Sequence, residues 1–261
     1  MFDVFPNSNR GVKEKMKYNA YVLHVKKGYE EREKSIIEQF ASLELPFEWI
    51  LEHDKEDITP EVLDKYQYSG DFNIEAVSCS LKHICVWERI AQGDHDGAFV
   101  FEDDVLIDLD RFKQVSQKAL SEYHERWPGC GYISLGSGCA LYVPWTKKRK
   151  NKLLYPAGYV RATDSYWINR ETAQKMVRWI GENGFAKPAD HLIDQICSEM
   201  DIPIFWLDPT LVNQGSHTGL FVSSIQTLER GKLWDRLEWK IKIFRRKYLY
   251  PLIGKDLTKN D

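Results

Sequence analysis

Hydrophobic and polar positions follow strand-like and helix-like patterns in turn from residue 18 onward. Residues 18–25 are rich in β-branched and aromatic side chains, which predicts a strand. Residues 30–43 place apolar side chains three and four positions apart, which predicts a helix with one apolar face. A second short strand is predicted at residues 47–51. A strand, a helix and a strand in this order form a βαβ unit, which is typical of the opening of a nucleotide-binding sheet.

The alternation continues to residue 207, interrupted by an acidic, irregular stretch at residues 52–72 and a basic loop at residues 144–152. Apolar periodicity and flanking turn residues predict the further elements. Helices are expected at 74–92, 111–126, 171–181 and 190–200, and strands at 98–101, 131–135, 164–169 and 203–207. This order predicts an α/β fold with a mostly parallel central sheet flanked by helices.

The chain is expected to contain one domain over residues 18–225, because no repeat or linker divides that stretch. A polar leader at residues 1–17 precedes it. The C-terminal segment, residues 226–261, has a different composition: between residues 230 and 247 eight Lys or Arg residues face two acidic ones, with Trp, Leu and Ile interleaved. This pattern predicts a basic amphipathic helix. Such a helix either lies in an anionic membrane interface or packs on the domain with its basic face in solvent.

Composition narrows the function classes. The 261 residues carry a net charge of −3, which argues against nucleic-acid binding. Five cysteines without a C-x-x-C pair favour a reducing compartment. We find no secretory signal pattern and no run of eighteen apolar residues. We therefore expect a cytoplasmic protein, with peripheral binding to the inner face of a membrane as an extension of the C-terminal pattern.

An acidic triplet, Glu102-Asp103-Asp104, directly follows the predicted strand at residues 98–101. Ligands of open α/β sheets bind at the carboxyl ends of the strands. Clustered carboxylates repel one another unless a cation offsets their charge, and Mg²⁺ or Mn²⁺ prefers such oxygen ligands. Alternation places Glu102 and Asp104 on one side as candidate metal ligands and Asp103 on the other. The alternative interpretation is a solvated charged loop or a cap for the next helix.

Several motifs surround the triplet in a characteristic order. Cys79-Ser80, His83 and Trp87 precede the apolar strand and the triplet. An early Arg32 follows the first strand. Three weaker blocks follow the triplet, at residues 165–169, 188–190 and 208–214. From about residue 20 to about residue 220, the chain thereby resembles glycosyltransferase family 25, which includes bacterial lipooligosaccharide galactosyltransferases and collagen galactosyltransferases. It departs from the bacterial pattern by placing Leu81-Lys82 between Ser80 and His83.

The resemblance implies a GT-A type fold and a metal-dependent, inverting transfer of a hexose from a UDP-sugar, UDP-galactose in known members. It implies Mn²⁺ or Mg²⁺ as cofactor and a saccharide or lipid-linked saccharide of cell-surface polysaccharide or lipooligosaccharide as acceptor. The implied donor-binding residues are Arg32, Ser80, His83 and Asp103. His217, in a glycine-flanked loop, is the candidate third metal ligand beside Glu102 and Asp104, with an exposed loop histidine as the alternative.

An inverting transfer needs a general base for the acceptor hydroxyl. Asp190 is the candidate, because it follows a proline at the start of a predicted helix and Asp194 lies one turn later. An ordinary helix cap is the alternative role. Two other protein classes also fit the pattern: a catalytically silent sugar- or nucleotide-binding module on the same fold, and a metal-dependent nucleotidyl- or phosphotransferase. The second would normally contain a glycine-rich phosphate loop, which this sequence lacks.

Overall fold

A seven-stranded sheet forms the centre of the molecule in the computed structural model, which describes residues 18–138, 140–215 and 232–259. The strand order is β2-β1-β3-β7-β5-β8-β6. Strands β2, β1, β3, β5 and β8 run in one direction, whereas β7 and β6 run against their neighbours. The strands of this sheet are β1 (Tyr18–Leu23), β2 (Glu48–Ile50), β3 (Gly97–Glu102), β5 (Tyr132–Ser134), β6 (Leu154–Ala157), β7 (Ser165–Asn169) and β8 (Ile204–Leu207).

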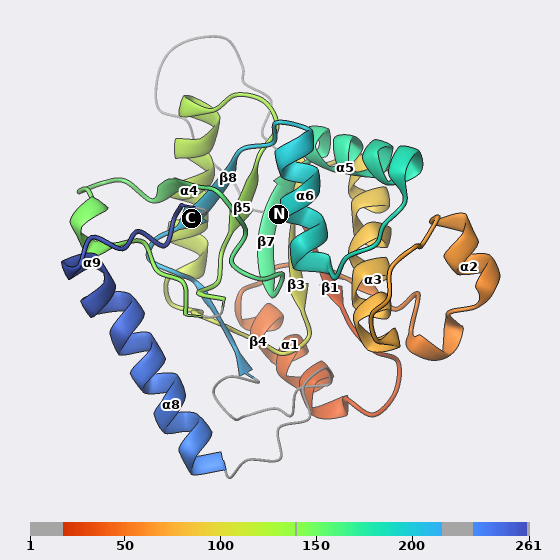
Figure 1. Cartoon of the computed structure of the whole chain (residues 1–261), viewed down its shortest axis with the longest axis horizontal. Coiled ribbons are helices and arrows are strands. Elements are labelled where there is room, and N and C mark those ends of the chain that lie inside the picture. Colours follow the sequence, from red (N-terminus) through yellow and green to blue (C-terminus); the bar gives the residue numbers. More distant parts are fainter. Residues whose placement is uncertain (1–17, 139, 216–231, 260–261) are drawn as a thin grey trace.

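Helices cover both faces of this sheet (Figure 1). The helices are α1 (Glu30–Ser42), α2 (Pro60–Lys65), α3 (Ile74–Gln92), α4 (Phe112–Arg126), α5 (Arg170–Asn183), α6 (Ala189–Glu199), α8 (Lys232–Phe244) and α9 (Tyr250–Leu252). Shorter turns are η1 (Lys55–Asp57), η2 (Trp145–Lys147) and η3 (Arg245–Leu249). A separate two-stranded antiparallel sheet pairs β4 (Val105–Ile107) with β9 (Val212–Gln214).

Strand alternation divides the core into two clusters. In β3, Val100 joins the cluster that contains the apolar faces of α3, α5 and α6, whereas Phe99 and Phe101 join the cluster that contains α1 and α4. Successive side chains of a strand point to opposite faces, so a central strand between two helix layers is apolar on both sides. This explains why residues 98–101 are apolar without a break. The architecture is therefore a three-layer α/β/α sandwich.

The predicted α/β class, the mostly parallel sheet and the opening βαβ unit are confirmed, since β1 and β2 are parallel neighbours joined by α1. The sequence patterns missed three short strands, β4, β6 and β9. They also missed α2, which lies within the stretch predicted to be irregular; Thr59 caps it by accepting the Val62 N–H, and Pro60 occupies its first turn. These elements have three to six residues, too few for a periodic signal.

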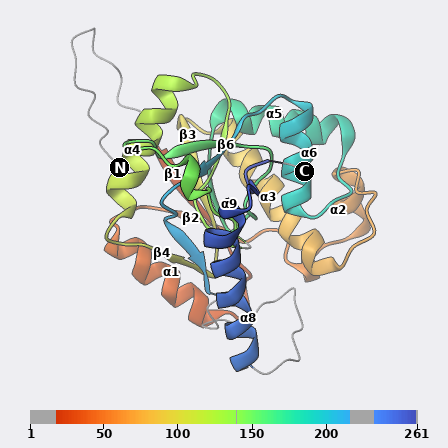
Figure 2. The ribbon, with the colours of Figure 1, turned by 60° about the vertical axis from the view of Figure 1, so that its left-hand side comes forward.

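The end of the C-terminal segment packs on the domain, which is one of the two alternatives predicted for this segment. Its last described residues pack on the domain: the Gly158 N–H donates to the Thr258 carbonyl at 2.9 Å, and the Tyr159 hydroxyl donates to the Leu257 carbonyl at 2.5 Å. Helix α8 lies outside the layered body (Figure 2). Within the described residues, no helix is long and apolar enough to span a membrane. The predicted leader at residues 1–17 lies outside the described residues.

Asp194, on α6, gives the fold a specific pH dependence. Its carboxylate accepts the Val160 N–H at 2.7 Å, and burial raises its pKa from 3.8 to about 6. The folded state therefore disfavours the ionised carboxylate, and the stability of the protein falls as pH rises from the unfolded pKa through the folded one.

We expect Asp194→Asn to raise the melting temperature at pH 8, because the amide oxygen keeps the Val160 hydrogen bond without a buried charge. The gain should disappear below about pH 4, where the wild-type carboxyl is protonated in both states. Thermal melts of both proteins across this pH range test the prediction. An equal difference at both ends would contradict it.

Candidate active site

The carboxyl ends of three parallel strands meet at one edge of the sheet. Leu23 at the end of β1 lies opposite Ile50 of β2 on one side and Glu102 of β3 on the other. The residues after these strands therefore lie close together around a cavity of about 580 Å³. Its polar lining includes His24, Lys26, Asp54, Ser78, Lys82 and the acidic triplet. This position is the ligand-binding edge of an open α/β sheet.

Two further segments complete this edge. Strand β7 runs antiparallel to β3, so the residues just before it reach the triplet. The Thr163 hydroxyl donates to the Glu102 carboxylate at 2.6 Å, and the Glu102 N–H donates to the Asp164 carbonyl at 2.9 Å. Strand β9 pairs with β4, which places Gln214 in the cavity lining, and the Gly215 N–H donates to the Asp104 carbonyl at 2.7 Å. The triplet lies between β3 and β4 and does not cap α4, which begins at Phe112.

Asp103 is held by a cation of the chain itself. Its two carboxylate oxygens contact His24 Nδ1 at 2.7 Å and Arg32 Nη1 at 2.8 Å, and all three side chains are buried. The Arg32 guanidinium also lies over the Tyr29 ring, 4.6 Å from its centroid. Both Asp103 and Arg32 are predicted from the sequence to contact the donor. Both line the cavity, and their charged groups face each other, because the end of β1 and the first turn of α1 meet the triplet there.

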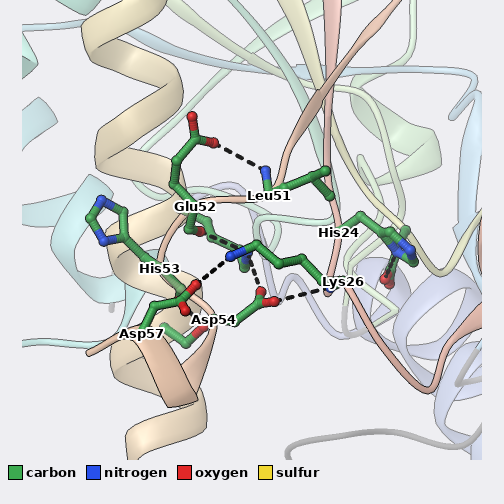
Figure 3. Close-up of polar contacts among 10 residues, drawn as sticks. His24, Lys26, Leu51, Glu52, His53, Asp54 and Asp57 are labelled. Carbon is green, nitrogen blue, oxygen red and sulfur yellow. Dashed lines mark hydrogen bonds and ion pairs between the residues drawn. The ribbon is translucent and has the colours of Figure 1, made fainter. Parts of the chain in front are cut away.

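Ion pairs engage the lysines around the cavity. Lys82 on α3 contacts Asp54 at 2.7 Å with both side chains buried, and it donates to the Glu52 carbonyl at 2.7 Å. Lys26 lies between two carboxylates: its N–H donates to Asp54 at 3.0 Å and its ammonium contacts Asp57 at 2.5 Å (Figure 3). These contacts fix the loop after β2 against the loop after β1. They engage carboxylates other than Glu102 and Asp104.

A buried hydrogen-bond chain joins Trp87, Tyr166 and His83 beside Glu102. The Trp87 indole N–H donates to the Tyr166 hydroxyl at 2.9 Å, and that hydroxyl lies 3.0 Å from His83 Nδ1. Indole can only donate, so the Tyr166 oxygen accepts from Trp87. His83 Nε2 lies 3.6 Å from the Glu102 carboxylate, which is beyond hydrogen-bond distance. The chain therefore fixes the His83 ring next to Glu102 without bonding to it.

Three potential metal-binding side chains, Cys79, His83 and Glu102, have ligand atoms within 4.8 Å of one another. Within the described residues, His83 Nε2 makes no hydrogen bond. Burial, together with the charges of Glu102 and Asp190, raises the pKa of the Cys79 thiol well above its usual range. Thiolate sulfur is a soft ligand that suits ions such as Zn²⁺ better than Mg²⁺ or Mn²⁺. The carboxylates of Glu102 and Asp104 suit Mg²⁺ or Mn²⁺ better, since these ions prefer oxygen.

Asp164 lies beneath this edge as a further buried carboxyl group. Burial first, and then the charge of Glu102, raises the pKa of Asp164 well above its usual range; Asp104 adds to the effect. Its Oδ2 accepts the Ser165 hydroxyl at 3.1 Å. A Cβ atom at Gly136 would lie 2.2 Å from the same oxygen, so only glycine fits there. The raised pKa favours the neutral form of Asp164, so the negative charge at this edge belongs to Glu102 and Asp104, and a divalent cation would offset it.

The other predicted residues lie at different distances from the cavity. Ser80 is fully buried in α3 and donates to the Ala76 carbonyl of its own helix at 3.0 Å, so its position gives no support to a donor contact. Asp190 lies in the first turn of α6, where Pro188 occupies the cap position, and its charge reaches Cys79 at the cavity wall. His217 lies outside the described residues.

Sequence reasoning did not single out several groups of this site. His24, Asp54 and Lys82 line the cavity, and Thr163 bonds to Glu102. The strand-end rule carries a signal for the first two, because His24 lies at the end of the first predicted strand and Asp54 follows the second, and both strands lead to the same edge as the triplet. Lys82 is one of the two residues, Leu81 and Lys82, that separate Ser80 from His83 and thereby depart from the bacterial family pattern. Thr163 depends on the reversed direction of β7, which the sequence pattern does not encode.

Comparison with known proteins places the chain among the glycosyltransferases. A family model matches residues 18–193, from the first strand into α6, and the matched range contains the triplet, Arg32 and Asp190. The chain belongs to glycosyltransferase family 25, whose model is described as an LPS biosynthesis protein. The resemblance seen in the sequence motifs is thereby confirmed. A search of curated protein sequences gave no significant match.

Solved structures with a similar arrangement are also glycosyltransferases. The catalytic domain of Drosophila β1,4-galactosyltransferase 7 in complex with xylobiose shares 10% identity, with a TM-score of 0.43, over 84% of this chain and 79% of that one. A mutant of the Drosophila enzyme in complex with manganese, UDP-Gal and xylobiose has the same identity and coverage and a TM-score of 0.40. A glycosyltransferase involved in glycosylation of the major capsid of PBCV-1 shares 10% identity, with a TM-score of 0.42, over 84% of this chain and 99% of that one. These likenesses are too distant to transfer a ligand to this chain.

Removing the Tyr166 hydroxyl should destabilise the protein by about 1–3 kcal/mol, because the Trp87 N–H and His83 Nδ1 would both lose a buried partner. Tyr166→Phe can be compared with wild type by denaturant unfolding monitored by Trp fluorescence.

Tyr132→Phe is a matched control for this prediction. The Tyr132 ring stacks on Tyr166 with centroids 4.8 Å apart, and within the described residues its buried hydroxyl makes no hydrogen bond. We expect this change to be neutral or slightly stabilising. Equal losses for the two variants would show that the hydrogen-bond chain adds no stability.

Proposed function

We propose that the protein transfers a hexose from a UDP-sugar to a saccharide acceptor with the help of a divalent cation bound at Glu102 and Asp104. The family establishes the glycosyltransferase class. One observation supports the finer proposal: the strand-end cavity contains four cation–carboxylate pairs, and these engage Asp54, Asp57, Glu75 and Asp103. None of these four pairs includes Glu102 or Asp104, whose carboxylates line the same cavity and would bind a divalent cation that in turn contacts a phosphate.

We expect the donor nucleotide to bind in this cavity in one orientation. The cavity extends from the triplet past His24 to the loop at residues 54–57 and to Ser78 on α3. The diphosphate would lie at the triplet, and the nucleoside would lie between the ends of β1 and β2, where backbone and side-chain polar groups can hydrogen-bond to it. Lys27 is an exposed cation in the lining of this cavity and can contact a phosphate oxygen.

Mn²⁺ or Mg²⁺ bound at Glu102 and Asp104 would supply positive charge next to the leaving diphosphate. The chain's own residues then have separate tasks. Thr163 orients the Glu102 carboxylate by a hydrogen bond, and the His83 ring lies beside it. The Arg32–Asp103 pair holds the turn that carries both ligands. His217 remains a candidate further ligand from its position in the sequence.

Inversion requires a base on the acceptor side, and we propose Asp190 for this role. Its carboxylate lies at the start of α6 and its charge reaches Cys79, which lines the cavity next to Glu102. Asp190 is partly exposed, as an acceptor hydroxyl requires. Deprotonation of that hydroxyl generates the nucleophile that displaces the diphosphate at the anomeric carbon.

The resemblance to family members favours galactose as the sugar and cell-surface polysaccharide or lipooligosaccharide as the product. A lipid-linked acceptor would be presented at the inner face of a membrane, which fits the basic C-terminal helix predicted from the sequence.

Asp104→Asn should reduce transfer at least about a hundredfold while leaving the melting temperature nearly unchanged, because the amide keeps the shape and removes the charge that binds the cation. The assay measures UDP released from a panel of UDP-sugars with Mn²⁺ or Mg²⁺ and a saccharide acceptor. Asp110→Asn is the matched control, because Asp110 is exposed and lies outside the cavity lining.

Several outcomes of that assay would overturn the proposal. If wild-type protein releases no UDP from any UDP-sugar with either ion, the protein does not catalyse the proposed reaction. Full activity after chelation of divalent ions would show that the reaction does not require a metal ion. Full activity of Asp104→Asn would place the metal ligands elsewhere.

Asp190→Asn should lower kcat by roughly a hundredfold or more and leave the dissociation constant for UDP within about twofold of wild type, because a base acts on the acceptor and not on the nucleotide. Single-turnover kinetics and calorimetric titration with UDP give the two values. A variant with near-normal kcat would move the base to another residue.

A further inference from the structure

The C-terminal helical segment has an outward apolar stripe that nothing in the described chain covers. Ten large hydrophobic side chains are exposed in the described residues, and six of them lie between residues 241 and 253. Single exposed apolar residues are ordinary on protein surfaces, whereas a contiguous group marks an interaction site. This concentration of exposed apolar side chains therefore indicates an interaction surface.

The helix has two faces with different tasks. Trp239, Ile243, Arg246 and Tyr250 recur at spacings of three and four and are half-buried, so they form the inward face. The opposite face carries Ile241, Phe244, Tyr248 and Leu252, exposed at 49%, 54%, 48% and 68%. Both sets follow the helix period, and the Phe244 and Tyr248 rings touch with centroids 5.5 Å apart. The inward side chains are partly covered, whereas the apolar side chains of the outward stripe are exposed and need a separate explanation.

Cations lie on both sides of the outward stripe. Lys240 and Lys247 flank it on one side and Arg245 on the other, and all three are exposed. Residues 238–255 contain six Lys or Arg and one acidic residue, in a chain with a net charge of −3. The rest of the chain is therefore more acidic than the whole, and the positive charge is concentrated where the apolar side chains are exposed.

The basic loop predicted at residues 144–152 adjoins this helix. Lys147 contacts both Asp256, by an ion pair, and the Thr258 hydroxyl at 3.0 Å. Lys247 lies over the Tyr142 ring, 5.4 Å from its centroid. The loop carries exposed Trp145 and exposed Lys148, Arg149 and Lys150. Figure 1 shows η2 beside α9, and Figure 2 shows α8 in front of the layered body.

We propose that the outward stripe of α8, η3 and α9, together with the loop at residues 144–152, binds the surface of an anionic lipid bilayer. Apolar side chains enter the interfacial region while flanking Lys and Arg side chains contact acidic headgroups. Trp and Tyr at the same surface have the amphipathic character that favours this boundary. The inference extends the proposed use of a lipid-linked acceptor, but binding to lipid does not require the proposed donor or metal.

Binding through the outward stripe orients the enzyme relative to the membrane as well as attaching it. Tyr250 packs against the core and Lys247 lies over the Tyr142 ring. A bilayer on the outward stripe therefore fixes the catalytic cavity at a defined side of the membrane. A substrate anchored in the same bilayer then reaches the cavity from one direction.

The test is cosedimentation of the full chain with vesicles of phosphatidylcholine alone and of equal parts phosphatidylcholine and phosphatidylglycerol. We expect at least about tenfold stronger binding to the anionic vesicles. The triple variant Ile241→Ser/Phe244→Ser/Leu252→Ser should lose at least about tenfold of that binding, because it removes the inserted side chains and keeps every cation. Ile37→Ser/Leu109→Ser is the matched control, since these residues are exposed at 48% and 40% on other elements.

Release of UDP with a water-soluble acceptor should be the same in the triple variant and wild type, which separates loss of lipid binding from loss of fold or of catalysis. Three results would overturn the proposal: wild type that does not bind anionic vesicles, a triple variant that binds them as wild type does, or equal binding to neutral vesicles. A wild-type dimer that the triple variant converts to monomer, without a change in vesicle binding, would assign the stripe to a second copy of the chain.

Discussion

The carboxylate of Asp103 organises the active-site edge, because it neutralises Arg32 and accepts a hydrogen bond from His24 in a buried position. This contact joins the end of β1, the first turn of α1 and the end of β3. Removing one partner of such a pair leaves an uncompensated buried charge, at a cost of about 3–5 kcal/mol. Glu102 and Asp104 flank Asp103 in the chain, so their positions depend on this anchor.

The site also separates its charges by role. Cations around the cavity bind carboxylates that shape the wall, whereas the Thr163 hydroxyl donates to Glu102 and the His83 ring lies beside it. Burial, and then the charge of Glu102, raises the pKa of Asp164. None of the four ion pairs described around the cavity includes Glu102 or Asp104, and these two carboxylates hold negative charge in a rigid place. That is the electrostatic condition for selecting a small divalent cation over a protein side chain.

Long periodic elements and the strand-end position of the triplet could be predicted from the sequence. The unbroken apolar run of β3 predicted that both faces of this strand are buried. The triplet at its end predicted where the carboxylates leave the sheet. The prediction of Arg32 and Asp103 as donor contacts missed their pairing, because two residues 71 positions apart meet only through strand order. Ser80 matched a motif, yet its hydroxyl bonds within its own helix. Short strands such as β9, which brings Gln214 to the cavity, depend on tertiary partners and have no local signal.

The reversed strand β7 and the two-stranded β4–β9 sheet also decide when the site can exist. Glu102 meets Thr163 across 61 positions of sequence, and Asp104 meets Gly215 from a still later segment. Closing such distances is slow and comes late in folding. During synthesis, the acidic edge is thus completed only after nearly the whole domain has left the ribosome. A partly made chain has no arrangement that would sequester nucleotide or metal, and ligand binding therefore stabilises only the finished fold.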